Sequence, residues 1–376
     1  MYKVVEVKTH RQMHDFAEFP NKLYKGCLQY VPAFFADEMK IFSDEKNPYS
    51  GDSVSKYFLC YKNKKIVGRI GGIIANRDNV KTGEKKIRFT RFDAIDDVEV
   101  AKLLFDSVAT FGKTHGMQKL HGPLGYNDQE REGMVISGYE NRVTFVNLYN
   151  YDYYPKLMRE LGFEKEVDYH EFKIYIEKQM IERFERVSKI VQKRTPVFDV
   201  LEEMSVSNVL KNYGDKFFAL LDECYSDLHG YMPTDKKTRD SMIKSFKIAL
   251  DKRFVSILRD ENNELVALGV AFPSLAKSLQ KYGGRMHPIA MLSMLSEMKK
   301  PEVVELGLIA VRPDMKNSGV NAVVMEKIAK NVIACGIEYV ESNAELEYNA
   351  NVQNLWKGFK TENHRNRRIF VREIEN

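Results

Sequence analysis

The chain has 376 residues, a length that predicts two domains with an ample buried core. Hydrophobic residues make up 44% of it and charged residues 30%, which is typical of a globular protein, and the formal net charge is only +5. This mild charge does not require a nucleic-acid partner, and no apolar run approaches the ~20 residues that cross a bilayer. We therefore expect neither a nucleic-acid nor a membrane partner.

The cysteines and the first residues indicate the compartment. The opening sequence MYKVVEVKTH has no signal-peptide core. The four cysteines lie far apart without metal-ligand spacing, so we expect reduced thiols, no metal site and a cytoplasmic protein: Cys27, Cys60, Cys224 and Cys335.

The first half of the chain mixes strand and helix patterns. Apolar residues recur on one face of 97–115, which predicts an amphipathic helix. A polar loop over 127–140 holds an acid cluster that could bind a cation or supply a base, although such runs more commonly face water. The order is a strand over 2–8, a helix over 10–25, strands over 56–61, 66–75 and 86–93, the 97–115 helix, a strand over 118–124, a helical segment over 150–162 and a strand over 167–176.

The second half begins after a charged helical segment. We interpret 177–195 as a linker helix, which Thr195-Pro196 ends, so the predicted domains are 1–176 and 196–376. The second domain is predicted to contain a strand over 198–204, helices over 207–228 and 234–250, a hairpin of strands over 254–259 and 265–272, and an insertion over 274–300.

The most informative stretch is 303–336, VVELGLIAVRPDMKNSGVNAVVMEKIAKNVIACG. Its apolar start predicts a buried strand, Arg312-Pro313-Asp314 stops that strand, and apolar residues return at helical spacing from Val320. The N–H groups at a helix start favour an anion such as a pyrophosphate, and Gly319 allows a ligand to approach closely. An ordinary strand–turn–helix connection explains the same pattern without a ligand.

This stretch resembles the acetyl-CoA motif of the GNAT acyltransferase superfamily. In that family a strand and V-x-P precede Arg or Gln, x, x, Gly, x, and Gly or Ala. A later segment, Asn349 followed by Trp356-Lys357-Gly358-Phe359, resembles the family's Asn…Tyr…Gly-Phe. The motif itself matches in register, with its first and last residues departing from the usual types, at Lys316, Asn317, Ser318, Gly319, Val320 and Asn321.

The resemblance implies an architecture. Both halves run in the same order of elements, so we expect an α/β protein of two tandem GNAT-like domains, each a mixed, mostly antiparallel sheet flanked by helices. In the first half the corresponding turn over 92–97 is acidic and has no glycine. Because carboxylates there would repel a diphosphate, we predict that only the second domain binds CoA.

The resemblance also implies roles for individual residues. Glu305 is the predicted base, although a carboxylate paired with a lysine explains it equally well, and Glu345 and Glu347 are weaker candidates. Tyr348 is the predicted acid for the leaving thiolate, because Trp356 has no titrating proton. Acetyl-CoA or another acyl-CoA would place its diphosphate against 316–321 and its pantetheine along Ile309, Ala310 and Val311.

We predict an acyl-CoA-dependent N-acyltransferase that acts on an amine of a small molecule or peptide. The alternatives are a non-catalytic GNAT-like binding module and an aminoacyl-tRNA-dependent transferase resembling the Fem family. The C-terminal basic run alternates with apolar residues and predicts a solvent-facing hairpin rather than a grip on nucleic acid or an adenosine phosphate: Arg365, Arg367, Arg368 and Arg372.

Overall fold

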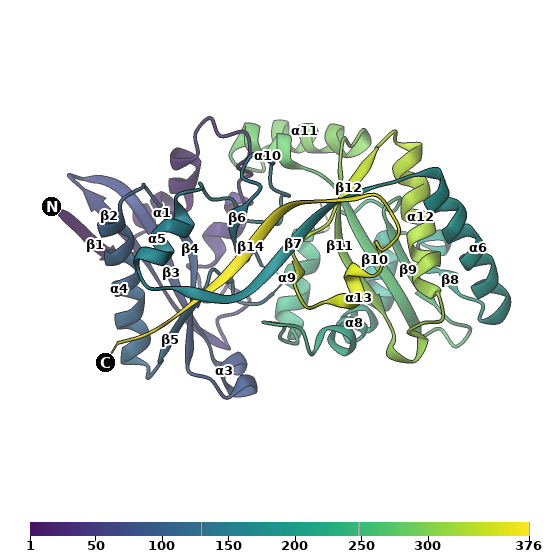
Figure 1. The fold of residues 1–376 in the computed structure, drawn as a ribbon, viewed down its shortest axis with the longest axis horizontal. Coiled ribbons are helices and arrows are strands. Elements are labelled where there is room, and N and C mark those ends of the chain that lie inside the picture. Colours follow the sequence, from purple (N-terminus) through teal and green to yellow (C-terminus); the bar gives the residue numbers. More distant parts are fainter. Residues whose placement is uncertain (129, 247–248, 376) are drawn as a thin grey trace.

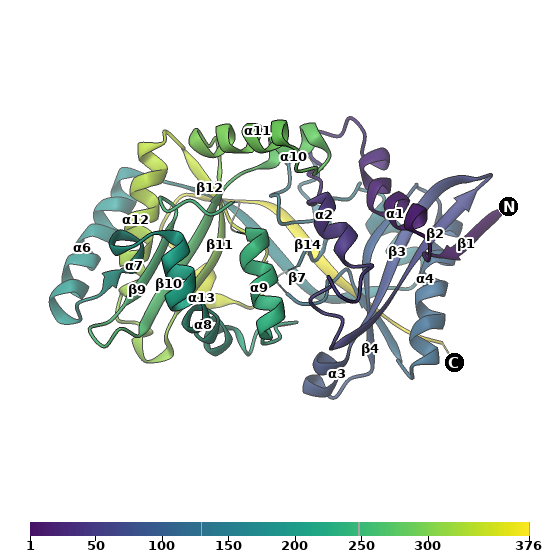
Figure 2. The ribbon, with the colours of Figure 1, turned by 180° about the vertical axis from the view of Figure 1, so that it is seen from behind.

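The protein consists of two halves joined by one sheet (Figures 1 and 2). The computed structural model describes residues 1–128, 130–246 and 249–375. Among the described residues the sheet has 14 strands, in the order β1-β2-β3-β4-β5-β14-β7-β12-β11-β10-β9-β8, with β6 beside β14 and β13 beside β7. Within the described ranges, no helix is both long enough and apolar enough to cross a bilayer.

The first half follows the predicted order of elements. The Asp97 side chain accepts the N–H groups of Glu99 and Val100 and so begins α4, whose apolar face is buried against the sheet. The short strand β6 lies inside the segment predicted to be a loop. The elements are β1 Tyr2–Glu6, α1 His10–Leu23, α2 Phe35–Lys40, β2 Ser53–Lys62, β3 Lys65–Ala75, α3 Asn76–Thr82, β4 Lys86–Ala94, α4 Val98–Thr114, β5 Lys119–Gly122, β6 Met134–Ser137, α5 Tyr154–Glu160 and β7 Glu164–Tyr175.

The second half confirms the predicted hairpin, β9 and β10, and resolves the insertion into two helices, α10 and α11. The predicted strand over 198–204 is wrong beyond Asp199, because the Asp199 carboxylate accepts the N–H of Leu201 and begins a helix there. The elements are α6 Lys178–Arg194, β8 Phe198–Asp199, α7 Val200–Glu203, α8 Val206–Tyr225, α9 Lys236–Phe246, β9 Val255–Arg259, β10 Leu265–Pro273, α10 Ala276–Tyr282, α11 Pro288–Lys299, β11 Val304–Val311, a 3-10 turn Pro313–Met315, α12 Val320–Ala334, β12 Tyr339–Glu341, β13 Glu345–Leu346, α13 Ala350–Gln353 and β14 Thr361–Glu373.

The last strand of each half pairs with the other half. β7 closes the first half in sequence, yet it pairs with β12 and β13 of the second half. β14 closes the second half in sequence, yet it pairs with β5 and β6 of the first half. The two exchanged strands also pair with each other and run side by side across the middle of the molecule (Figure 1). The segments 1–176 and 196–376 therefore share one sheet.

A buried ion cluster joins these two strands, which corrects the predicted solvent-facing hairpin at the C-terminus. The side chains of Arg365 and Arg367 on β14 and of Glu171 on β7 are fully buried, and each arginine donates to one oxygen of the carboxylate. Burial alone would raise the pKa of Glu171, but the two guanidinium groups outweigh burial and hold that pKa below its usual value. Strand alternation failed as a guide because a central strand is covered on both faces.

We expect Glu171→Gln to lower the free energy of unfolding by about 3–5 kcal/mol, because it leaves two buried guanidinium groups without their counter-ion. Urea or thermal unfolding measures this change. The control is Glu362→Gln, which removes a half-exposed carboxylate on β14, 3.9 Å from Lys173, and should cost less than about 1 kcal/mol. Equal losses in the two variants would contradict the role given to the buried cluster.

Candidate functional site

A cavity of about 310 Å³ lies where β11 and β12 separate. Most of its wall comes from the second half, and Glu132, Val146 and Tyr169 of the first half also border it. These strands pair in parallel only at Val304↔Val340 and Glu305↔Glu341. Beyond that point β11 continues to Val311, whereas the chain after β12 turns toward β7 and pairs there as β13. The gap between the diverging segments opens into the cavity, which is bordered by 306–309 on one side and 342–346 on the other.

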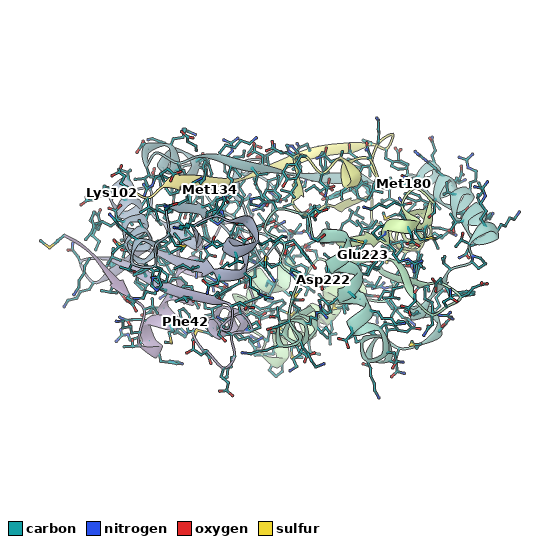
Figure 3. All side chains as sticks on the ribbon, turned by 90° about the horizontal axis from the view of Figure 1, so that it is seen from below. Phe42, Lys102, Met134, Met180, Asp222 and Glu223 are labelled. Atoms are coloured by element: carbon teal, nitrogen blue, oxygen red, sulfur yellow. The ribbon has the colours of Figure 1, made fainter. Side chains whose placement is uncertain are left out.

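Most of the cavity wall is apolar. The helix α8 forms one side, and its last turn lies in the middle of the molecule, where Figure 3 shows Asp222 and Glu223 between the halves marked by Met134 and Met180. Opposite α8, the strands β10 and β11 carry a bulge at Gly307, where an added Cβ would lie 2.5 Å from the ring of Phe272. Apolar side chains on the wall include Val209, Phe217, Phe218, Leu221, Val270 and Leu308.

One end of the cavity is polar. Glu132 reaches it from the loop before β6, His229 follows α8, and Glu345 lies on β13. Burial raises the pKa of Glu345 to about 7, and the indole Nε1 of Trp356 donates to its Oε1 at 3.0 Å. Burial, followed by the charge of Asp128, raises the pKa of Glu132 well above its ordinary value. A carboxyl group with a pKa near neutrality, such as that of Glu345, can exchange protons with a substrate.

The two residues predicted to be catalytic lie elsewhere. Glu305 is 2% exposed, its Oε2 accepts the N–H of Phe145 at 3.0 Å, and burial raises its pKa to about 8. Tyr348 is 58% exposed. Neither residue is among the described residues that border the cavity, so the structure does not bring them together at its wall. Their catalytic roles remain predictions.

The edge of β11 that faces the gap is already bonded to α8. The hydroxyl of Tyr225 donates to the carbonyl of Ile309 at 2.9 Å and accepts its N–H at 3.2 Å. The thiol of Cys224 donates to the carbonyl of Val311 at 3.2 Å. The end of α8 thus bonds the Ile309 N–H and carbonyl and the Val311 carbonyl, in the segment of β11 that the sequence predicts would hold pantetheine.

The predicted diphosphate loop lies at the start of α12. Lys316, Asn317 and Ser318 are exposed, and Asn317 and Gly319 both have positive φ. An added Cβ at Gly319 would lie 2.9 Å from Val187 on α6, so this glycine also lets α6 pack against α12. One of the first N–H groups of the helix already has a hydrogen-bond partner, because Val320 donates to the Ser318 hydroxyl at 3.2 Å. The binding role of 316–321 remains a prediction.

A second cavity, of about 190 Å³, lies in the first half. It shares Glu130 and Val146 with the large cavity, so these residues form part of the wall of both cavities. Its wall combines apolar side chains with charged ones: Arg69 donates to Asp93 at 2.7 Å, and Arg91 lies in a bulge of β4 at positive φ. A bulge turns a strand side chain away from its regular direction, here toward this cavity.

Several site residues were missed or given little weight in the sequence. Glu345 was a weaker candidate than Glu305, and Glu132 was one acid of a loop interpreted as solvated. His229 and Tyr225 were not identified. The acid cluster over 127–140 was the available signal, but only the fold brings that loop to the gap beside β11.

Comparison with curated proteins identifies two sequences that resemble this chain. No family model matches the chain. The chain is 21% identical to protein YghO of Escherichia coli over 385 residues, which cover 98% of this chain and 95% of that protein. It is also 21% identical to the bacterial ceramide synthase of Caulobacter vibrioides over 301 residues, which cover 79% and 76% of the two chains.

Solved structures resemble the whole chain. A tandem GNAT protein from the clavulanic acid biosynthesis pathway superposes with a TM-score of 0.55 at 8% identity and covers 100% of this chain and 99% of its own. A GCN5-related N-acetyltransferase from Sphaerobacter thermophilus superposes with a TM-score of 0.51 at 9% identity, over 100% and 96% of the two chains. The predicted architecture is thereby confirmed, and the chain has the fold of a tandem GNAT protein.

Proposed function

We propose that the protein transfers a long acyl group from acyl-CoA to a primary amine. The observation that carries this proposal is the apolar cavity of about 310 Å³ at the point where β11 and β12 diverge. An acetyl group needs no such volume, whereas each methylene of a longer chain gains up to ~0.8 kcal/mol when it leaves water. A ceramide is a long-chain amide, so the name of the Caulobacter relative is consistent with this substrate class.

The reaction forms a C–N bond and breaks a C–S bond. The amine nitrogen attacks the thioester carbonyl carbon, the CoA thiolate leaves, and the nitrogen gives up a proton. We assign that proton to Glu345, because this carboxyl borders the polar end of the cavity and its pKa of about 7 suits a base at neutral pH. Glu305 would then act indirectly, by holding the backbone of Phe145 in the wall of the second cavity.

The acyl-CoA substrate would lie across the second half. Its diphosphate would contact the exposed loop over 316–318 at the start of α12, where a lysine charge and a helix N-terminus favour an anion. Its pantetheine would approach the edge of β11. This edge is bonded to Tyr225 and Cys224, so binding requires the end of α8 to move or to exchange these hydrogen bonds.

The amine would arrive from the first half. The second cavity shares Glu130 with the large one, and its wall holds four carboxyl groups beside three guanidinium groups, so an ammonium group would find carboxyl partners there. This route gives the first domain, which is predicted not to bind CoA, a part in binding the acceptor. The bonded edge of β11 also favours the rival function, a GNAT-like module that binds a ligand without transfer.

We expect Glu345→Gln to lower kcat/KM by ~10²–10⁴-fold, because the variant has no base to accept the proton. In the unsubstituted protein kcat/KM should rise with pH through an inflection near 7, since the base acts only when deprotonated. The control Glu347→Gln removes a neighbouring carboxylate that is paired with Lys165 at 2.7 Å and should leave the rate unchanged. A rate insensitive to Glu345→Gln would exclude this base.

We expect acyl-CoAs of increasing chain length to raise the melting temperature progressively, because longer chains bury more apolar surface in the native state. Gly214 on α8 borders the cavity, and an added Cβ there meets no atom within 4 Å. Gly214→Phe should therefore abolish the extra rise in melting temperature that long-chain acyl-CoAs give, while short acyl-CoAs bind as before. Gly214→Ala should keep that extra rise. A response that is independent of chain length would contradict the proposed substrate.

We expect Tyr225→Phe to tighten acyl-CoA binding about three- to tenfold, because it removes the hydroxyl that occupies the Ile309 backbone. Isothermal titration with acyl-CoA measures this affinity. The control Tyr231→Phe removes a hydroxyl that bonds Asp222 at 2.6 Å and should have no such effect. Weaker binding by Tyr225→Phe would mean that this hydroxyl contacts the ligand itself.

A further inference from the structure

The helix α11 carries an apolar face that no described residue covers. Ile289, Leu292 and Leu295, spaced three apart, are 64%, 67% and 59% exposed, whereas Ala290 and Met294 on the opposite face are buried. The helix lies along the upper edge of the molecule in Figures 1 and 2, outside the sheet. Leu28 is 77% exposed and adjoins this region, since Gln280 on α10 donates to its carbonyl at 2.8 Å. Exposed apolar side chains gathered in this way mark a contact surface.

Positive charge surrounds this face. The segment 276–302 contains five lysine or arginine residues and two glutamates. Glu297 accepts the N–H groups of Lys277 and Ser278, and Glu302 pairs with Lys277, so both acids are occupied. Lys281, Lys299 and Lys300 are exposed and form no ion pair with any residue that the structure describes. The apolar face is thus flanked at both ends by cations without a carboxylate partner among the described residues.

We propose that α11 lies in the headgroup region of an anionic lipid bilayer, with Ile289, Leu292 and Leu295 inserted and the flanking lysines on lipid phosphates. Apolar side chains exposed on a helix can insert into a membrane surface when basic residues beside them contact the lipid phosphates. A second copy of this chain is a poorer occupant, because a self-complementary contact would bring its own lysines against these. A membrane partner was not expected from the sequence, because it has no apolar run long enough to cross a bilayer. A helix that lies on the membrane surface needs no such run.

The position of α11 relates this surface to the second cavity. The turn between α10 and α11 adjoins the cavity wall, because Phe35 donates its N–H to the Gly284 carbonyl at 2.9 Å and Asn21 donates to the Gly283 carbonyl at 3.3 Å. Phe35 and Asn21 both border that cavity. A membrane at α11 would therefore hold a lipid-soluble amine close to the cavity proposed for it.

Cosedimentation with vesicles tests the docking. The full chain should sediment with vesicles of equal parts phosphatidylglycerol and phosphatidylcholine, and less with pure phosphatidylcholine. Ile289→Asp/Leu292→Asp should weaken this binding by about tenfold or more, because two inserted side chains become charged. Lys299→Ala/Lys300→Ala should weaken it at low salt and reduce its salt dependence. The matched control Val80→Asp/Ile190→Asp changes two exposed apolar residues on α3 and α6 and should bind as the unsubstituted chain does.

Thermal melting of each variant checks that it is folded. The proposal is overturned if the unsubstituted chain does not sediment with anionic vesicles, or if Ile289→Asp/Leu292→Asp binds them as strongly as the unsubstituted chain. The same holds if the control variant loses as much vesicle binding as the α11 variant. It is also overturned if sedimentation velocity without lipid finds a dimer that Ile289→Asp/Leu292→Asp dissociates, since the face would then bind a second copy. The vesicle assay needs no acyl-CoA, so its failure is distinguishable from a failure of the proposed acyl transfer.

Discussion

The structure depends on one buried carboxylate, Glu171, held between Arg365 and Arg367. Glu171 precedes these two arginines by 194 and 196 positions in the chain, so the cluster joins residues that only the finished fold brings together. Removing three charges from water is costly, and their mutual attraction offsets that cost only in good geometry. The cluster therefore favours the one register of β7 against β14 that pairs all three groups, and that register fixes how the two halves meet.

Exclusion of water also explains the raised pKa values of the carboxyl groups in the candidate site. An apolar cavity disfavours ionised carboxylates, so the pKa values of Glu345 and Glu132 rise at its polar end. Glu171 shows the opposite outcome although it is also buried, because two cations face it. The two cases differ in the cations that face the carboxylate: Glu171 has two and stabilises the fold, whereas Glu345 pairs with no cation among the described residues and keeps a pKa near neutrality.

The sequence predicted the fold better than the site. The run Val304–Val311, its proline stop and the helix from Val320 have local causes, so pattern and propensity were sufficient to identify them. Arg365 and Arg367 were predicted to face solvent, because alternation cannot reveal that β14 is a central strand. The cavity wall combines α8, β10, β11 and the loop before β6, and no local pattern reports which distant segments converge. Glu345 gained its importance only from that convergence.

The exchange of terminal strands constrains how the protein folds during its synthesis. While the chain is being synthesised, β5 and β6 remain without β14, which follows the other strands of the second half in the chain. Contacts this distant in sequence close slowly, and an unpaired strand edge attracts other chains in the meantime. The sheet around β5 and β6 is therefore completed only after β14 has been synthesised and has reached it.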